Sequence, residues 1–177
     1  TTFAITDPTA DRTITFPDAD VTLGAAEDNT PAFFAYLTAN QTVTDNTATK
    51  LECDGELFDT ASAYDNSTNY RFTVPAGEGG KYVVTSQISY INGNASGAVI
   101  KTMIYVGGVE KAHAYEDLVN NTYEDTVLMC QTILVLSAAD YVEAYGLWDI
   151  ENPGTPGFGG NASSMSSYFS AFKLAGA

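Results

Sequence analysis

Histidine is the side chain that hydrolase triads and zinc sites most often use, and this chain has one, His113. A Ser-His-Asp hydrolase would have to use His113 as its base. The residue lies between two alanines, with no nucleophile-elbow motif nearby. Zinc needs a cluster of His and Cys side chains, which the sequence does not supply. We therefore predict a surface or interface position for His113 and no enzyme activity.

Carboxylates near expected strand ends are the other residues that could do chemistry. Oxygen ligands at turns can coordinate calcium, and the candidate ligands are Glu116, Asp117, Asp125 and Asp140. No EF-hand or other calcium-loop pattern accompanies them. The favoured interpretation is a solvated acidic rim without a cofactor, and a calcium site is the alternative.

The single tryptophan, Trp148, precedes the longest predicted loop, residues 152–160. An exposed Trp148 would stack on a sugar ring while Asp149 and Glu151 accept hydrogen bonds from the sugar hydroxyls. However, Trp148 shares a predicted strand face with Val142, and burial is the more common use of such a side chain. A glycan site and a core tryptophan are both open at this stage, with the core favoured.

Short strands bounded by turns must position all of these residues. The chain contains 11 Tyr and 9 Phe, which favours strands over helices. Tyr82, Val84, Ile88 and Tyr90 follow the period of two that a strand requires. Eight such segments and no convincing helix predict an all-β sandwich or jelly roll. The predicted strands cover residues 32–39, 49–53, 70–74, 82–90, 98–106, 127–136, 141–148 and 166–174.

Composition excludes two classes of partner. Hydrophobic residues make up 45% of the chain and charged residues 16%, which predicts a well-buried core. The net charge of −15 repels nucleic acid and anionic membranes. No apolar run approaches the roughly 20 residues that span a bilayer. We therefore expect no nucleic-acid binding and no membrane insertion.

The two cysteines, Cys53 and Cys130, match no metal-binding spacing. Each lies in a strand-like run, so the expectation is a buried, small apolar group. A disulfide would require the two strands to be neighbours, and this alternative stays open.

Residues 53–86 contain a closely spaced order of sequence features. They are an acidic turn after Cys53, the pair Tyr64-Asp65, the strand start Arg71-Phe72-Thr73 and the segment Gly80-Lys81-Tyr82. This order, together with the closing segment 168–174, resembles the C1q globular head, a jelly roll shared with the tumour-necrosis-factor cytokines. The resemblance implies a C1q/TNF-like jelly-roll β-sandwich over residues 31–177 that assembles as a homotrimer.

The predicted strand 127–136 is apolar on both faces. In a monomeric sandwich a strand alternates apolar and polar residues, so one face here needs a second cover. A neighbouring subunit is the natural cover, and the chain's own loops are the alternative. With the resemblance, this places the strand near a threefold axis. The interface candidates are Val127, Leu128, Met129, Ile133, Leu134, Val135 and Leu136.

Residues 1–30 form a separate unit, with two short strands around a Pro-Asp turn and a linker from residue 24 to residue 30. Residues 7–19 are similar to a segment that precedes the carboxy-terminal head in tailed-phage fibre and virion proteins. That likeness implies an attachment or stem segment that contacts other virion proteins through residues 1–26. Its candidate residues are Arg12, Phe16 and Asp18. No Gly-x-y collagen repeat is present, which also favours a phage or bacterial protein.

These observations predict a non-enzymatic phage virion structural protein, either a trimeric fibre or a capsid decoration. Its head would be displayed on the virion surface and bind a host receptor or glycan. The alternative is a secreted or bacterial cell-surface, lectin-like binding module with the same fold. Residues 1–26 favour the virion protein, because such a segment has no obvious use in a soluble lectin.

Overall fold

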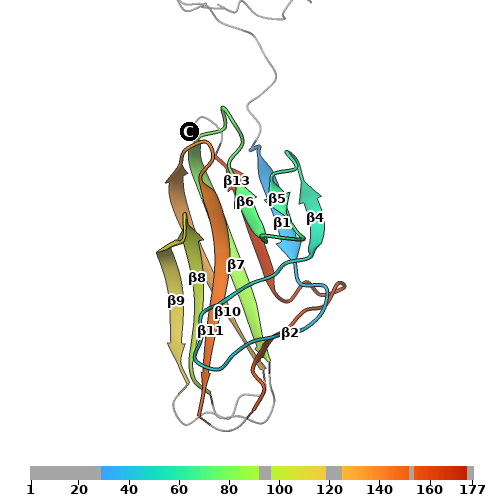
Figure 1. Cartoon of the computed structure of the whole chain (residues 1–177), viewed down its shortest axis with the longest axis vertical. Helices are drawn as coiled ribbons and strands as arrows, with labels where there is room; N and C mark the ends of the chain where they lie inside the picture. The colour runs from blue at the N-terminus through green and yellow to red at the C-terminus, as the bar shows by residue number, and fades with distance from the viewer. Residues whose placement is uncertain (1–28, 92–96, 119–124, 152–153, 175–177) are drawn as a thin grey trace, which may run out of the picture.

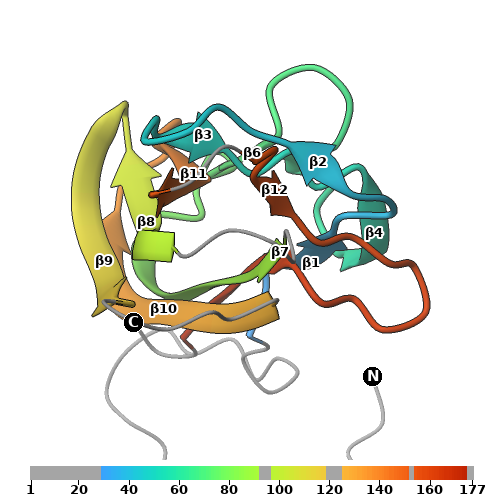
Figure 2. The same ribbon diagram turned by 90° about the horizontal axis from the view of Figure 1, so that it is seen from below.

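The computed structural model describes residues 29–91, 97–118, 125–151 and 154–174. Within these ranges the chain forms thirteen strands and no helix. Accordingly, no helix in this part is long and apolar enough to cross a membrane. The strands build two antiparallel sheets that face one another (Figures 1 and 2). The all-β class predicted from the sequence is confirmed.

Two predictions about the amino-terminal segment cannot be compared with the fold. The attachment residues Arg12, Phe16 and Asp18 lie outside the described residues, which begin at residue 29. The proposed domain boundary at residue 30 lies at their edge.

The first sheet has seven strands in the order β2-β12-β7-β13-β1-β4, with β10 paired along β7. The two longest strands, β7 and β10, pair over twelve residues each. The bounds are β1 Ala32–Tyr36, β2 Gln41–Thr42, β4 Gly55–Asp59, β7 Gly80–Ile91, β10 Asp125–Leu136, β12 Gly157–Phe158 and β13 Tyr168–Lys173.

The second sheet has six strands in the order β5-β6-β11-β8-β9, with β3 paired to β11. Strand β9 is its edge, and it contacts the first sheet's edge strand β10 along one side of the sandwich. The bounds are β3 Thr49–Lys50, β5 Tyr64–Asp65, β6 Arg71–Thr73, β8 Gly97–Val106, β9 Val109–Asp117 and β11 Tyr141–Ile150.

Aromatic side chains from both sheets fill the space between them. Phe33 of the first sheet stacks on Tyr64 of the second at a centroid distance of 4.8 Å. Tyr90 meets the edges of Trp148 and Phe158, each at 5.6 Å. Such ring pairs add to the burial of their large apolar areas and fix how the sheets stack. The predicted inward face of β7 is confirmed, since all four of its members are fully buried: Tyr82, Val84, Ile88 and Tyr90.

Both cysteines are free and buried, which confirms the interpretation of Cys53 and Cys130 as apolar groups. Burial raises the pKa of the Cys53 thiol far above its usual range. The Tyr64 hydroxyl donates a hydrogen bond to the carbonyl oxygen of Cys53 at 3.2 Å. No disulfide forms between the two residues.

All eight predicted strands are present, but some short or polar strands were missed. Strand β9 was missed because its sequence, VEKAHAYED, is polar and lies at an exposed edge. Strand β4 lies where an acidic turn was expected. The segment 152–160 was predicted as a loop, yet it contains β12, which pairs with β2 and β7. Tertiary pairing partners, which a local pattern does not reveal, stabilise these short strands.

Candidate interface on the first sheet

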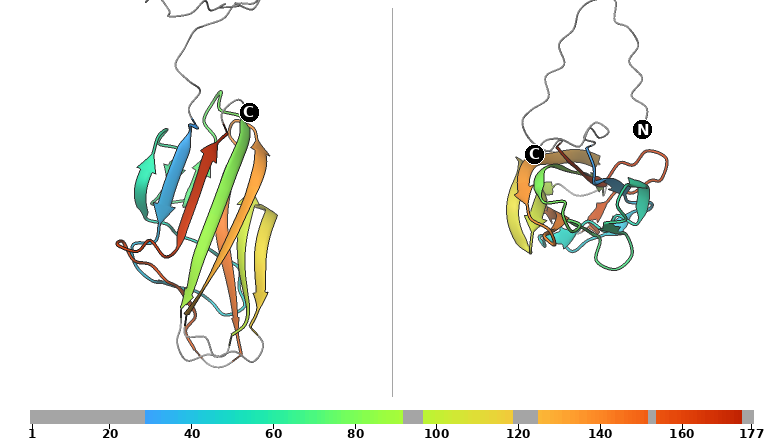
Figure 3. Two further views of the ribbon diagram at one scale, coloured as in Figure 1. Left: turned by 180° about the vertical axis from the view of Figure 1, so that it is seen from behind. Right: turned by 90° about the horizontal axis from the view of Figure 1, so that it is seen from above.

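The outward face of the first sheet carries most of the large exposed apolar side chains of the described residues. Strands β4, β1, β13, β7 and β10 lie side by side there, and no other strand of the described residues covers them (Figure 3, left). On β10, Ile133 is 61% exposed and Val135 is 80% exposed. Further exposed apolar side chains come from three strands: Val127, Met129, Phe58 and Phe172. We call this surface, the outward side of β4, β1, β13, β7 and β10, the outer face.

Cross-strand pairs explain why these residues lie together. Ile133 of β10 stands opposite Val83 of β7, and Val83 stands opposite Phe172 of β13. Farther from β10 on the same face, Phe34 of β1 stacks on Tyr168 of β13 at a centroid distance of 4.9 Å. Neighbouring side chains on one face of antiparallel strands stabilise each other in this way. The outer face is therefore continuous from β10 to β4.

The predicted interface residues divide between the two sides of β10. Four of them point outward and are exposed: Val127, Met129, Ile133 and Val135. The other three are corrected, because they point inward. Leu136 is buried in the core, and Leu128 and Leu134 pack against it. The period of two divides any strand in this way, so only every second residue of an apolar run can reach a partner.

The outward residues of the other strands were not predicted from the sequence. Phe34 and Phe172 lie in segments where core and surface aromatics alternate, whereas Phe58 lies in β4, none of whose residues is buried. The alternation around Phe172, with buried Phe169 and Ala171 on the opposite side, was the signal that could have revealed them.

Charge is sparse on four of the five strands of the outer face, whereas the edge strand β4 carries Glu56 and Asp59. Among the described outward side chains of β1, β7, β10 and β13, the charged ones are Lys81 and Asp125, each at the start of its strand. The whole chain nevertheless carries a net charge of −15. The acidic residues are therefore concentrated on the remaining surface and in the loops.

Trp148 is not available to stack on a sugar. It is 1% exposed and packs edge-on against Tyr90 in the core. This confirms the core interpretation and removes the predicted ligand role of Trp148. Asp149, which is half-buried, and Glu151, which is exposed, lack the aromatic platform that the glycan hypothesis needed.

The four candidate calcium ligands do not form one site. Glu116, Asp117 and Asp125 lie where β9 ends and β10 begins, whereas Asp140 follows the other end of β10. A strand of twelve residues spans about 40 Å, so Asp140 cannot share an ion with the others. Asp140 instead accepts a hydrogen bond from the Ser137 amide at 2.8 Å. No cluster of three metal-binding side chains occurs among the described residues.

His113 lies on the exposed edge strand β9, as a surface position requires. Its Nδ1 is 2.7 Å from Oε1 of Glu110, and Lys101 Nζ is 2.8 Å from Oε2 of the same carboxylate. The hydrogen bond from Lys101 is the main reason that the pKa of Glu110 lies below its usual range. These groups form a charged surface cluster, and its side-chain hydrogen bonds join Lys101 and His113 to Glu110.

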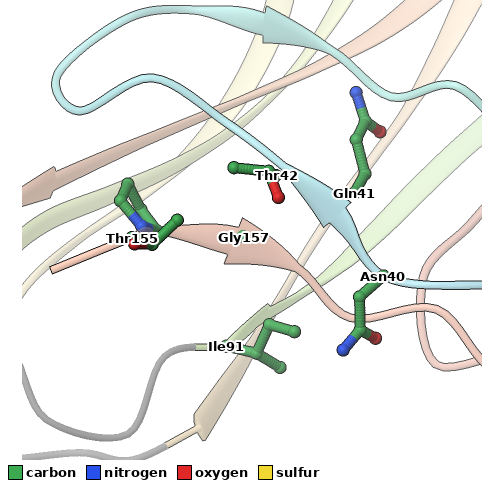
Figure 4. Close-up of a pocket in the computed structure, with 7 residues that line it drawn as sticks. Asn40, Gln41, Thr42, Ile91, Thr155 and Gly157 are labelled. Atoms are coloured by element: carbon green, nitrogen blue, oxygen red, sulfur yellow. The ribbon is translucent and has the colours of Figure 1, made fainter.

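A polar groove lies where β2, β12 and the end of β7 meet (Figure 4). Its volume is about 180 Å³. Asn40 Oδ1 accepts a hydrogen bond from the Gly160 amide at 3.0 Å, whereas Gln41 points away from β12. Residues 155–157, which belong to the predicted loop 152–160, line this groove. The complete lining is Asn40, Gln41, Thr42, Ile91, Thr155, Pro156 and Gly157.

The arrangement of the sheets can be compared with known proteins. No family model matches the chain, and no curated protein sequence matches it. Solved structures do match. Eiger TNF from S. frugiperda superposes with a TM-score of 0.56 at 16% identity, over 82% of this chain and 93% of that chain. The globular domain of zebrafish complement 1qA protein superposes with a TM-score of 0.52 at 13% identity, over 81% of this chain and 97% of that chain.

The chain has the C1q/TNF-like jelly-roll fold. The match covers nearly the full length of both solved domains, so this fold accounts for the whole of the described sandwich. At these identities the likeness establishes the fold and not the source or the partner. Within the C1q/TNF-like jelly roll, the outer face carries exposed apolar side chains from β4, β10 and β13.

Proposed function

We propose that the chain forms a homotrimer through the outer face and acts as a non-enzymatic structural protein on a virion surface. The observation that carries this proposal is a broad apolar face on an otherwise strongly acidic protein. Exposed apolar patches of this kind mark protein–protein contacts in soluble proteins. Strand β10 of that face presents four exposed apolar side chains. Val127 and Met129 are about half exposed, and Ile133 and Val135 are more exposed.

A second copy of the same chain is the partner that the charges favour. Two molecules with a net charge of −15 each repel one another wherever their acidic surfaces approach. The part of the outer face formed by β1, β13, β7 and β10 reduces this repulsion, because its charges, Lys81 and Asp125, lie at strand ends. Closed threefold symmetry, implied by the resemblance to C1q and tumour-necrosis-factor domains, gives every copy the same cover.

The virion assignment rests on the amino-terminal segment. Residues 7–19 are similar to a segment of tailed-phage fibre and virion proteins that precedes a carboxy-terminal head. In this proposal residues 1–26, with Arg12, Phe16 and Asp18, attach the trimer to other virion proteins. The jelly roll is then the exposed head of a fibre or of a capsid decoration.

Purified particles from the source test the virion assignment. Mass spectrometry of such particles should detect the chain at a fixed ratio to the major capsid protein, and an antibody to the head should label the particle surface. A chain that is found in the medium or on the bacterial surface and is absent from particles would contradict the virion assignment. It would favour the secreted or cell-surface binding module instead.

Host recognition is the second part of the proposal, and the polar groove is its candidate place. Amide and hydroxyl groups, as on Asn40, Thr42 and Thr155, are the groups that bind sugar hydroxyls. A glycan array of the wild-type head should give hits that are lost when Thr42→Trp fills the groove. Hits unchanged by Thr42→Trp would exclude the groove as the receptor site.

A further inference from the structure

One polar residue interrupts the apolar strip on β10. The outward side chains of this strand after Asp125 are Val127, Met129, Gln131, Ile133 and Val135. Gln131 lies at the middle of the five and is exposed. In any assembly that covers the strand, a glutamine at that position buries less apolar area than a hydrophobic residue would. Its presence therefore needs a specific explanation.

The side chain of Gln131 is partly oriented within its own subunit. Its Nε2 donates a hydrogen bond to Oγ1 of Thr85, the residue opposite on β7, at 2.9 Å. Thr85 is 8% exposed, and it pairs in turn with Ser170 of β13. A polar row of Gln131, Thr85 and Ser170 thus crosses the outer face. On one side of it lies an apolar row that contains Ile133, Val83 and Phe172, and on the other side lies the row of Met129, Gln87 and Tyr168.

The hydrogen-bonding capacity of Gln131 is not used up by this contact. A glutamine amide has two N–H donors and a carbonyl acceptor. The bond to Thr85 is the one that its side chain makes within the part of the chain that the structure describes. In a single copy, water satisfies the second N–H and the carbonyl. Once a partner excludes that water, each of these groups must find a protein partner or remain unpaired at a cost.

We propose that Gln131 fixes the alignment of subunits in the homotrimer, by meeting the Gln131 side chains of the other copies. This inference rests on the proposed assembly through the outer face. Around a closed ring each amide donates its second N–H to the carbonyl of the next, so all three are satisfied. A slipped arrangement, which does not close into a ring, would place the amide against Met129 or Ile133 of a neighbour and leave it unpaired. A single buried polar residue sets register in other assemblies for the same reason.

Gln131→Glu tests whether these side chains meet. If they do, three carboxylates would crowd together, and their charged forms would repel. The nearest outward side chains on β7 and β13, Thr85, Gln87 and Ser170, do not titrate. Strand β9 also packs against β10, and it carries the titratable residues Glu110 and His113. Because both are present in the wild type as well, a pH dependence that only the variant shows would come from the introduced carboxyl group. We expect the dissociation constant of the Gln131→Glu trimer to rise at least tenfold between pH 5 and pH 8, measured by sedimentation equilibrium.

Val109→Glu is the matched control, because it adds the same charge at an exposed position of β9, in the second sheet. The proposal requires a pH dependence in Gln131→Glu that exceeds the one in Val109→Glu. Equal behaviour of the two variants, with a trimeric wild type, would overturn the role of Gln131 and leave the trimer intact. A monomeric wild type would instead refute the proposed assembly itself.

Gln131→Leu supplies a second measurement, since it makes the apolar strip continuous. We expect this variant to melt at a higher temperature than the wild type but to give a mixture of stoichiometries in native mass spectrometry. A single trimeric species with Gln131→Leu would show that the apolar contacts alone set the alignment, which contradicts the proposal.

Discussion

Ile133 and Leu134 are consecutive residues of β10, yet the first is 61% exposed on the outer face and the second packs against the core. This contrast separates assembly from folding within one strand. A charge at Ile133 opposes contact with a partner but leaves the core intact. A charge at Leu134 must enter the core, where an unpaired carboxylate costs several kcal/mol.

We therefore expect Ile133→Asp to give a folded monomer and Leu134→Asp to fail to fold. Circular dichroism would report folding, and light scattering after size-exclusion chromatography would report mass. If both variants unfold, or if both remain trimeric, the assignment of the two sides of β10 is wrong.

Trp148 provides a test of the core. Because the side chain is fully enclosed and meets Tyr90 edge-on, Trp148→Ala should lower the free energy of unfolding by about 3–5 kcal/mol. Urea denaturation measures this change. Glu151→Ala is the control, since Glu151 is exposed, and it should change stability by less than about 0.5 kcal/mol. A small effect of Trp148→Ala would contradict the packing described here.

Cys53 and Cys130 should resist thiol reagents in the native protein. Both are buried, and burial raises the pKa of each thiol, so the reactive thiolate is scarce at neutral pH. Ellman's reagent should find no fast-reacting thiol before denaturation and two per chain afterwards. Rapid labelling of the folded protein at pH 7 would contradict the buried positions.

Asp65 should contribute a pH-dependent part of the stability. Its carboxylate accepts hydrogen bonds from the amides of Thr68, Ser67 and Asn69 and from the Asn69 side chain, and these hold its pKa well below the usual value. A lowered folded-state pKa means that this stabilisation is present above the unfolded value, near 4, and is lost as pH falls toward the folded value. Asp65→Asn should therefore be less stable than the wild type at pH 7, and the difference should shrink below about pH 4. Urea denaturation at several pH values would reveal a constant difference if this account is wrong.

The fold could be predicted from the sequence because its longest strands carry their own pattern. Tyr82 to Tyr90 alternate inward and outward, and their inward positions follow from the period of two alone. The order of short elements around Tyr64 and Arg71 added the C1q-like topology. Strands such as β12, with two residues, exist because β2 and β7 lie on either side of them. Nothing in the local sequence Gly157-Phe158 predicts this pairing.

The candidate site was less predictable, since it is a property of a surface and not of a segment. The apolar run 127–136 pointed to a partner, but it did not say which residues faced that partner. Leu136 was included for its hydrophobicity and is buried in the core. Phe34, Phe58 and Phe172 join the outer face through strand pairing between distant segments. A local sequence pattern does not reveal which distant strands pair, so these residues could be assigned to the outer face only from the structure.

Deletion of residues 1–26 would test the division of the chain. The described sandwich starts at β1, Ala32–Tyr36, and its core draws on residues from Phe33 onward. We expect the truncated chain to fold and assemble like the full chain but to be lost from particles. Unfolding of the truncated head, seen by circular dichroism, would mean that the amino-terminal segment belongs to the core.

Sedimentation equilibrium of the wild-type chain, with Ile133→Asp beside it, tests the central claim most directly. The account predicts a wild-type mass of three times the 18.8 kDa chain at micromolar concentration. It predicts the mass of a single chain for Ile133→Asp. A wild-type protein that sediments as an 18.8 kDa monomer under these conditions would contradict the assignment of the outer face as a subunit interface.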